Sequence, residues 1–312
     1  MKQIAVIGRR SSIVTANLIG TMLRRTTGRK VGVLNPEDRE DALCGGLHQL
    51  ALQGCDCAVA ALRDDAAGES FQVGILTDWG DGPIPKAAGA CERLVVSMDD
   101  ECGKKLAAER AAFTYSERRD EADLTAKNLR CYPDRIEFEA LTWSSIHRVR
   151  MPVLGGYDIY HGLAALGCGL SMGYSLDQLV PSIEQAAGVP GHLEQIPTDQ
   201  PFCLVVDQAS HALELEDLLL TLRPMRGKGG MLRLLPGAVS EEEWGLASDV
   251  AGGLADEVIR PGGDRNQNVH ELLNRGRAGD VLVIAGVHDP GSKDDERRMA
   301  AQWLQHRSRS AV

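Results

Sequence analysis

The start of the chain alternates apolar runs with a helical pattern, and this alternation limits the fold more than any other feature. Residues 2–7 and 30–34 are apolar runs. Between them, Val14, Leu18 and Met22 recur at a spacing of four, which places them on one face of a helix. A strand, a helix and a second strand form a βαβ unit, whose parallel sheet is covered on both faces. The sequence therefore predicts an α/β fold with a mostly parallel sheet.

The same alternation continues to the end of the chain. A Val-Pro-Gly turn at residues 189–191 follows a predicted helix, and we place a domain boundary there. Residues 1–190 then form the larger domain with a mostly parallel sheet, and residues 191–312 form a smaller, Rossmann-like α/β domain. The predicted strands after the first unit are 57–62, 73–77, 94–98, 202–206, 231–235, 257–260 and 281–285, and the predicted helices are 163–172, 177–187, 212–222, 241–251, 269–275 and 292–305.

Charge and composition exclude several classes of function. The net charge of -10 opposes nonspecific binding to nucleic acid, which requires a basic face. No stretch reaches the roughly 20 apolar residues of a membrane span, and the apolar start is too short for a signal peptide. We therefore expect a cytoplasmic protein that binds neither nucleic acid nor a membrane.

The cysteines give no metal-binding pattern. Only two of the eight are close in sequence, and a single C-x-C pair lacks the paired spacing of zinc sites. We predict no metal site and expect buried, reduced thiols. The cysteines are Cys44, Cys55, Cys57, Cys91, Cys102, Cys131, Cys168 and Cys203.

Five segments, in chain order, are similar to motifs of one enzyme family, the Mur ligases, and best to the type that adds the third residue of the peptidoglycan stem peptide. They are VSMDD at 96–100, GGYDIYHGLAA at 155–165, VPGHLE at 189–194, VVDQAS at 205–210 and GDVLVIAGVHD at 279–289. The resemblance implies a Mur-ligase-like central ATP-binding domain followed by the family's C-terminal domain. The family's N-terminal domain, which holds the UDP-sugar substrate, has no counterpart in this sequence.

The loop after the first strand departs from this family's phosphate-binding pattern, G-T-N-G-K-T-T. Ser12 stands in place of the lysine that meets the phosphates, and Ile13 in place of the hydroxyl that holds Mg²⁺. Ser11 replaces the second glycine. Phosphoryl transfer in such loops depends on all three. The resemblance therefore marks a vestigial nucleotide loop, which consists of Gly8, Arg9, Arg10, Ser11 and Ser12.

Other positions of the family's nucleotide cleft are also changed. The Mg²⁺-binding glutamate falls near Ala60, and the T-N-L-x-x-D-H segment has become TDWGDG at residues 77–82. The D-N-P-R substrate motif has no convincing match. The remaining residues of the vestigial cleft replace family asparagines (Asp158, His161), replace the linker arginine (His192), align with the carbamoylated lysine in a shortened segment (Lys86) or follow predicted C-terminal strands (Asp207, His288).

Each candidate also has a structural interpretation. Arg9 and Arg10 precede a helix, where free N–H groups attract a phosphate or carboxylate, but a solvated basic turn has the same sequence. Asp207 is either a remnant of a substrate site or an acid in a turn. The histidines either line the vestigial cleft or are structural. We assign no catalytic residue from the sequence.

Two functions remain open. In the first, which we favour, the chain is a pseudoenzyme that has lost ATP-dependent ligation and acts as a binding or scaffolding protein. It then needs no cofactor, and it binds a protein partner or forms a homo-oligomer. In the second, the chain is an ATP- and Mg²⁺-dependent ligase with a rebuilt nucleotide site, which joins a carboxylate to an amine. Fold alone decides neither.

Overall fold

The computed structural model describes residues 1–9, 12–35, 40–131, 135–152, 158–186, 191–209, 212–237, 241–260, 264–286 and 295–310. Contacts divide the chain into two compact units. The first consists of Met1–Val153 and Tyr157–Ala187, and the second of Leu154–Gly156 and Gly188–Val312. The expected boundary between residues 190 and 191 falls beside segment 187–190, which lies outside the described residues.

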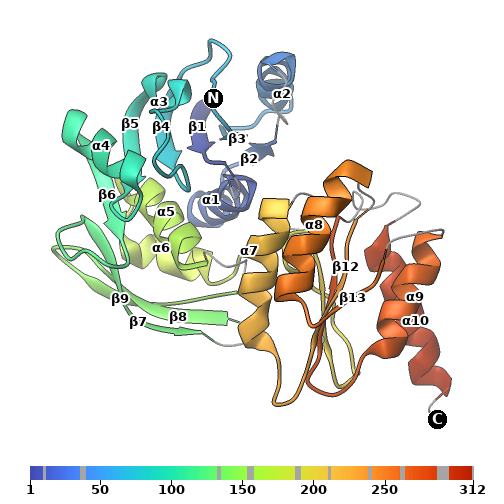
Figure 1. Cartoon of the computed structure of the whole chain (residues 1–312). Helices are drawn as coiled ribbons and strands as arrows, with labels where there is room; N and C mark the ends of the chain where they lie inside the picture. The colour runs from blue at the N-terminus through green and yellow to red at the C-terminus, as the bar shows by residue number, and fades with distance from the viewer. Residues whose placement is uncertain are drawn as a thin grey trace. The chain divides into compact units, whose positions relative to one another are not determined.

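The first unit is built on a nine-stranded sheet with the order β2-β3-β1-β4-β5-β6-β7-β8-β9 (Figure 1). Strands β2 to β7 in this order are parallel to their neighbours, and β8 and β9 are antiparallel. The fold class expected from the sequence is therefore confirmed. The strands are β1 (Lys2–Ile7), β2 (Val31–Leu34), β3 (Cys57–Leu62), β4 (Phe71–Leu76), β5 (Cys91–Ser97), β6 (Ala112–Ser116), β7 (Leu124–Cys131), β8 (Arg135–Leu141) and β9 (Ile146–Pro152).

Apolar runs form the parallel core because both faces of this part of the sheet are covered. All six residues of β3 are buried, and Ala5 of β1 pairs with Ala60 of β3 at its centre. Helices α2, α3 and α4 cover one face, where Leu43, Leu47 and Leu106 enter the core. The helices of this unit are α1 (Ser12–Thr27), α2 (Glu40–Leu52), α3 (Lys86–Gly89), α4 (Glu101–Glu109), α5 (Asp158–Ser171) and α6 (Leu176–Ile183).

Helices α1 and α5 pack together against the other face of the sheet. Small residues make this possible: a side chain at Gly20 would meet Val33, and one at Gly167 would come within 2.9 Å of Val95. The buried residues of α1 include Val14, Leu18 and Met22, as their spacing predicts. This packing fixes the N-terminus of α1 beside the ends of the central strands.

The second unit holds a five-stranded sheet with the order β10-β11-β14-β12-β13, in which only β10 runs antiparallel to its neighbour. Helices α9 and α10 pack on one face and α7 and α8 on the other. Its strands are β10 (Glu194–Gln195), β11 (Cys203–Val206), β12 (Leu232–Leu235), β13 (Glu257–Val258) and β14 (Val281–Ile284), and its helices are α7 (Ala212–Leu222), the 3-10 helix η1 (Arg223–Met225), α8 (Glu241–Leu254), α9 (Arg265–Arg275) and α10 (Glu296–Ser310).

The described cysteines are free thiols, and most of them are buried as expected. Burial raises the pKa of Cys57 and of Cys91 to about 11, so both thiols are protonated at neutral pH. Cys44 is an exception because its side chain is exposed, and Cys203 is half-buried. No helix among the described residues is long and apolar enough to cross a membrane.

Candidate functional site

The carboxyl ends of the parallel strands form the natural ligand-binding edge of the first unit. Strand β1 lies between β3 and β4. From β1 the chain continues to β2 and β3, which lie on one side of it, and then crosses to β4 on the other side. Open α/β sheets bind ligands at such a switch point. The loops after β1, β4 and β5 meet at this edge, and they contain the vestigial nucleotide loop.

The loop after β1 is in close contact with the loop after β4. A Cβ atom at Gly8 would overlap the Thr77 hydroxyl and lie 2.6 Å from Oδ1 of Asp78. The Thr77 hydroxyl donates a hydrogen bond of 2.7 Å to that same oxygen. The Asp78 carboxylate is therefore held against the first glycine of the vestigial nucleotide loop. In the family motif this position is an asparagine, which carries no charge.

Arg9 is engaged by the same loop after β4. Its guanidinium lies over the Trp79 ring, 4.8 Å from the ring centroid, in a cation–π contact. Trp79 is buried, and its Nε1–H donates to the Pro83 carbonyl at 2.6 Å. Arg10 and Ser11 lie outside the described residues, and Ser12 is the first residue of α1.

The Asp99-Asp100 pair follows β5 and holds neighbouring loops in place. Asp100 caps α4 by accepting from the Gly103 N–H at 3.0 Å, and it also accepts from the Gly80 N–H at 2.6 Å. Asp99 accepts from the Ser116 hydroxyl and from the Glu117 N–H. These carboxylates therefore accept hydrogen bonds from loop N–H groups that have no partner in a strand or helix.

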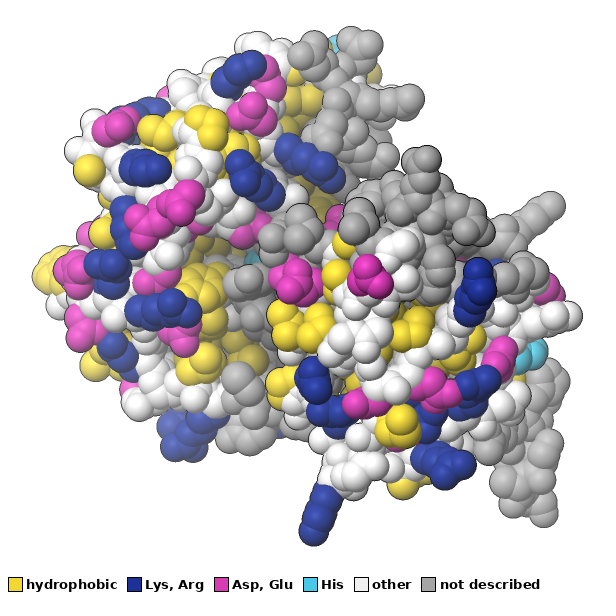
Figure 2. Space-filling view, viewed as in Figure 1, with side chains coloured by type: hydrophobic (Ala, Val, Ile, Leu, Met, Phe, Trp, Pro, Cys, Tyr) yellow, Lys and Arg dark blue, Asp and Glu magenta, His cyan; other side chains and the backbone are white. Residues whose placement is uncertain are grey.

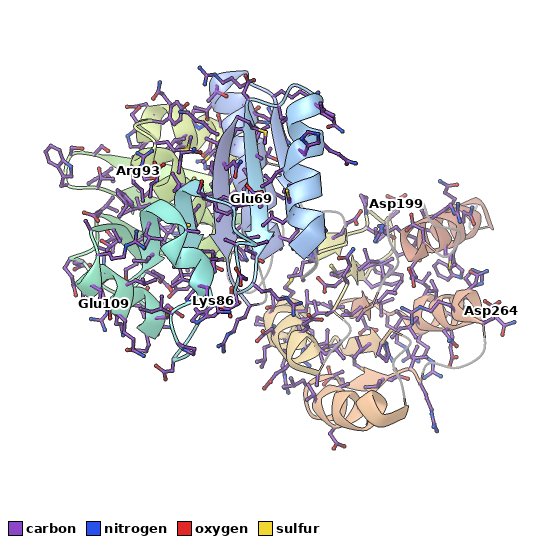
Figure 3. The ribbon with its side chains drawn as sticks, turned by 90° about the horizontal axis from the view of Figure 1, so that it is seen from above. Glu69, Lys86, Arg93, Glu109, Asp199 and Asp264 are labelled. Carbon is purple, nitrogen blue, oxygen red and sulfur yellow. The ribbon has the colours of Figure 1, made fainter. Side chains whose placement is uncertain are left out.

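Three other predicted positions of the first unit lie on separate elements. Lys86 begins the short helix α3 at the surface, where its Nζ lies 3.7 Å from an Asp65 carboxylate oxygen (Figure 3). His161 is buried between α5 and α1, with Nδ1 2.8 Å from the Thr15 hydroxyl. Asp158 begins α5, and its side chain lies outside the described part.

The resemblance predicts that the position of the Mg²⁺-binding glutamate falls near Ala60. Ala60 is fully buried within β3 and belongs to the apolar core that α2 covers. A core alanine offers no ligand to a metal. Among the described residues, no group of three His, Cys, Asp or Glu side chains could hold a metal ion.

In the second unit, His192 and Asp207 come together at the end of β11. Burial is the main cause that raises the pKa of Asp207 above its usual value, and backbone donors partly oppose it. Its two oxygens accept from the Leu193 and Ala209 N–H groups, both at 2.7 Å. Burial also lowers the pKa of His192, while Asp207 and Glu214 act in the opposite direction. His288 lies outside the described residues.

Arg265 is a charged centre that the sequence analysis missed. Its guanidinium donates to the Pro236 and Ala285 carbonyls, at the carboxyl ends of β12 and β14, and its Nε lies 3.0 Å from an oxygen of the fully buried Glu296. Asp264 caps α9 directly before it (Figure 3). The available signal in the sequence was the Asp-Arg pair after Pro-Gly-Gly, because this pattern is typical of a helix start.

The chain resembles known ligases over most of its length. No family model matches it. It is 25% identical over 225 residues to UDP-N-acetylmuramoyl-L-alanyl-D-glutamate–2,6-diaminopimelate ligase of Bacillus velezensis, which covers 62% of this chain and 46% of that protein. The enzyme of the same name from Pseudomonas syringae pv. tomato is 28% identical over 240 residues, or 65% of this chain and 49% of that protein. The chain thus spans about half the length of the curated relatives it matches.

Solved structures share the fold. A structure of the same type of diaminopimelate ligase matches with a TM-score of 0.71 and 18% identity, over 99% of this chain and 79% of that one. The MurF ligase of Thermotoga maritima in complex with ADP matches with a TM-score of 0.73 and 13% identity, over 100% of this chain and 81% of that one.

The two sheets and their order give the chain the α/β architecture of these ligase structures. Its sequence relatives and its fold together support a relationship to the Mur ligase family, over part of the relatives' length.

Proposed function

We propose that this relative of the Mur ligases is a binding or scaffolding protein that does not turn over ATP. The observation that carries the proposal is the position of Asp78. Its carboxylate lies against Gly8, at the start of the loop where the family holds phosphates. Two unit charges of the same sign 4 Å apart repel by about 4 kcal/mol at an effective dielectric constant near 20.

The groups that remain do not fit ATP and Mg²⁺. Ser12 and Ile13 open α1 without the lysine and the hydroxyl of the family loop, and Ala60 provides no carboxylate. Positioned charges of this kind each contribute several kcal/mol to phosphoryl transfer, and each ~1.4 kcal/mol changes a rate tenfold. Arg9 is already stacked on Trp79 and starts from a different place in the loop.

Calorimetric titration with ATP and Mg²⁺, followed by a phosphate-release assay, tests this proposal. We expect no magnesium-dependent binding and no turnover in the presence of amino acids or peptides. Ser12→Lys with Ile13→Thr should not restore turnover, because Ala60 still supplies no metal ligand. The alternative is an active ligase that joins a carboxylate to an amine. It would be established by wild-type turnover that disappears in Arg9→Ala and persists in Arg29→Ala, an exposed arginine elsewhere.

The same proposal implies that the fold is used for binding, by a protein partner or by a second copy of the chain. Light scattering and pull-down from the native host measure this directly. A strict monomer that retains no partner would contradict it.

A further inference from the structure

The β8–β9 hairpin ends in an exposed apolar tip. Trp143 is 96% exposed and Ile146 is 65% exposed, the first and third highest values among the exposed large hydrophobic side chains. The Thr142 N–H donates to the Ser145 carbonyl at 2.9 Å, so the turn that carries Trp143 is closed by its own hydrogen bond. Two large apolar side chains exposed at one hairpin tip, one of them aromatic, form a small apolar surface that a partner can cover.

Strand β9 is the last strand of the described sheet, and part of its outer backbone edge is open. The Arg150 N–H points away from β8, because it donates to Glu184 Oε1 at 3.0 Å. Backbone groups alternate in direction along a strand, so those of Ile146 and Arg148 also point away from β8. The edge from Ile146 to Arg148 therefore offers backbone donors and acceptors to an added strand.

On the solvent face of β9 the outermost charges are positive, whereas the nearby acidic side chains are Asp177, 3.7 Å from His147 on the other face, and Glu184, which accepts from the Arg150 N–H. On the solvent face, Glu137 lies 3.0 Å from Arg135 and 3.6 Å from Arg150, and its side chain is only 15% exposed. Glu139, directly opposite Arg148, instead accepts from Asn128 at 2.7 Å. Among the side chains that the structure describes, Arg148 has no ion pair within 4.0 Å. An exposed guanidinium thus stands between the apolar tip and the partly covered end of the edge.

We propose that the Ile146–Arg148 edge with Trp143 binds an extended acidic peptide segment of a partner protein, which adds as a further strand. Its backbone would pair with Ile146 and Arg148, an apolar side chain would contact Trp143 and Ile146, and an acidic side chain would pair with Arg148. A second copy fits poorly. Antiparallel pairing of two β9 strands about Arg148 would place two arginines opposite each other and would need the Arg150 N–H that Glu184 already occupies.

Fluorescence anisotropy with a labelled hexapeptide that alternates valine and aspartate tests the proposal on the full chain. We expect saturable binding that weakens about tenfold or more in Arg148→Glu and in Trp143→Ala. The matched controls are Arg223→Glu and Leu220→Ala, which change an exposed arginine and a half-exposed leucine elsewhere and should leave binding unchanged. The same peptide with N-methyl groups on alternate residues should not bind, since it cannot pair with the edge.

Other results would overturn the proposal. These are no binding at millimolar peptide, equal binding of a valine–lysine peptide, or equal affinity of Arg148→Glu and wild type. Phosphatidylglycerol vesicles distinguish the other class of anionic surface. The vesicles would then cause a blue shift of tryptophan fluorescence, and Trp143→Ala would remove it. This result, without peptide binding, would assign the tip to a membrane surface and reject the peptide site.

Discussion

At the scale of single residues, the charged side chains at the carboxyl ends of the strands in both sheets are held mainly by hydrogen bonds to the backbone. Asp100 and Asp207 each accept two backbone N–H groups, and Arg265 donates to two carbonyls. Such bonds fix the loops after the strands. These side chains therefore contribute to stability, whether or not they also line a site. His161 differs, because its Nδ1 lies 2.8 Å from the side-chain hydroxyl of Thr15, where the ring is buried between two helices.

Arg265→Ala should destabilise the second unit by about 2–4 kcal/mol, because the buried Glu296 loses the Arg265 guanidinium and two carbonyls lose a donor. Urea unfolding measures this change. Arg277→Ala is the control, since its side chain is exposed and surface substitutions usually change stability by less than about 0.5 kcal/mol. Equal effects of the two substitutions would show that the Arg265 contacts contribute little.

His192 should make stability depend on pH. Its pKa is lowered in the folded chain by burial, so below about 6.5 the unfolded chain binds more protons than the folded chain. The free energy of unfolding should therefore rise with pH toward 6.5 and then gain nothing further from this group. His192→Gln should remove that part of the rise. Urea unfolding of both proteins between pH 5 and about 8 compares them, and parallel curves would contradict the prediction.

At the scale of elements, the sequence predicted the buried strands of both sheets because each is a continuous apolar run between turns. In the first sheet it did not reveal β6, β7, β8 and β9. Strand β8, RIEFEAL, alternates buried and half-buried residues, and its charged positions interrupt any apolar run. Helix α2 was also missed, because its glycines weaken the helical pattern.

Acidic and basic side chains are interspersed over the face in Figure 2, as the composition suggests.

The candidate site was less predictable than the fold for a physical reason. Motif comparison identified positions that lack catalytic groups, but it could not show what occupies the space. The contact of Asp78 with Gly8 and the stacking of Arg9 on Trp79 depend on how two loops fold against each other. Their residues are about 70 positions apart, so no local pattern encodes the contact.

Gly8→Ala should destabilise the β1–α1 turn by about 1–3 kcal/mol, because the new Cβ would overlap Thr77 and Asp78. The comparison is Gly45→Ala in α2, where a Cβ meets nothing within 4 Å. That substitution should instead stabilise the chain by about 0.5–1 kcal/mol, through helix propensity. Thermal unfolding gives both values. A neutral Gly8→Ala would show that the loop after β4 can move away from Gly8, so that the Asp78 carboxylate is not held against the start of the vestigial nucleotide loop.

At the scale of the whole molecule, each unit has its own sheet and its own buried clusters. The core of the first unit includes Ile7, Leu76 and Leu94, and the second is built around Val206, Leu235 and Ile284. A unit with its own hydrophobic core is expected to fold alone. The assignment of the two units to a Mur-ligase-like central domain and C-terminal domain, at 1–190 and 191–312, stays a prediction that fragments can test.

The fragment 191–312 should fold cooperatively by itself, and the fragment 197–312 should be less stable by a few kcal/mol. Residues 191–195 are tied to the second unit by several hydrogen bonds: Leu193 N–H to Asp207, Gln208 N–H to the Gly191 carbonyl, and the β10–β11 pairing of Glu194 and Gln195. Their loss leaves a buried carboxylate without one donor and exposes the outer edge of β11, and each such bond contributes about 0.5–1.5 kcal/mol net. Far-UV circular dichroism during urea unfolding measures both fragments. If the shorter fragment is as stable as the longer one, residues 191–195 are a connection and not part of the second unit, and the boundary lies further along the chain.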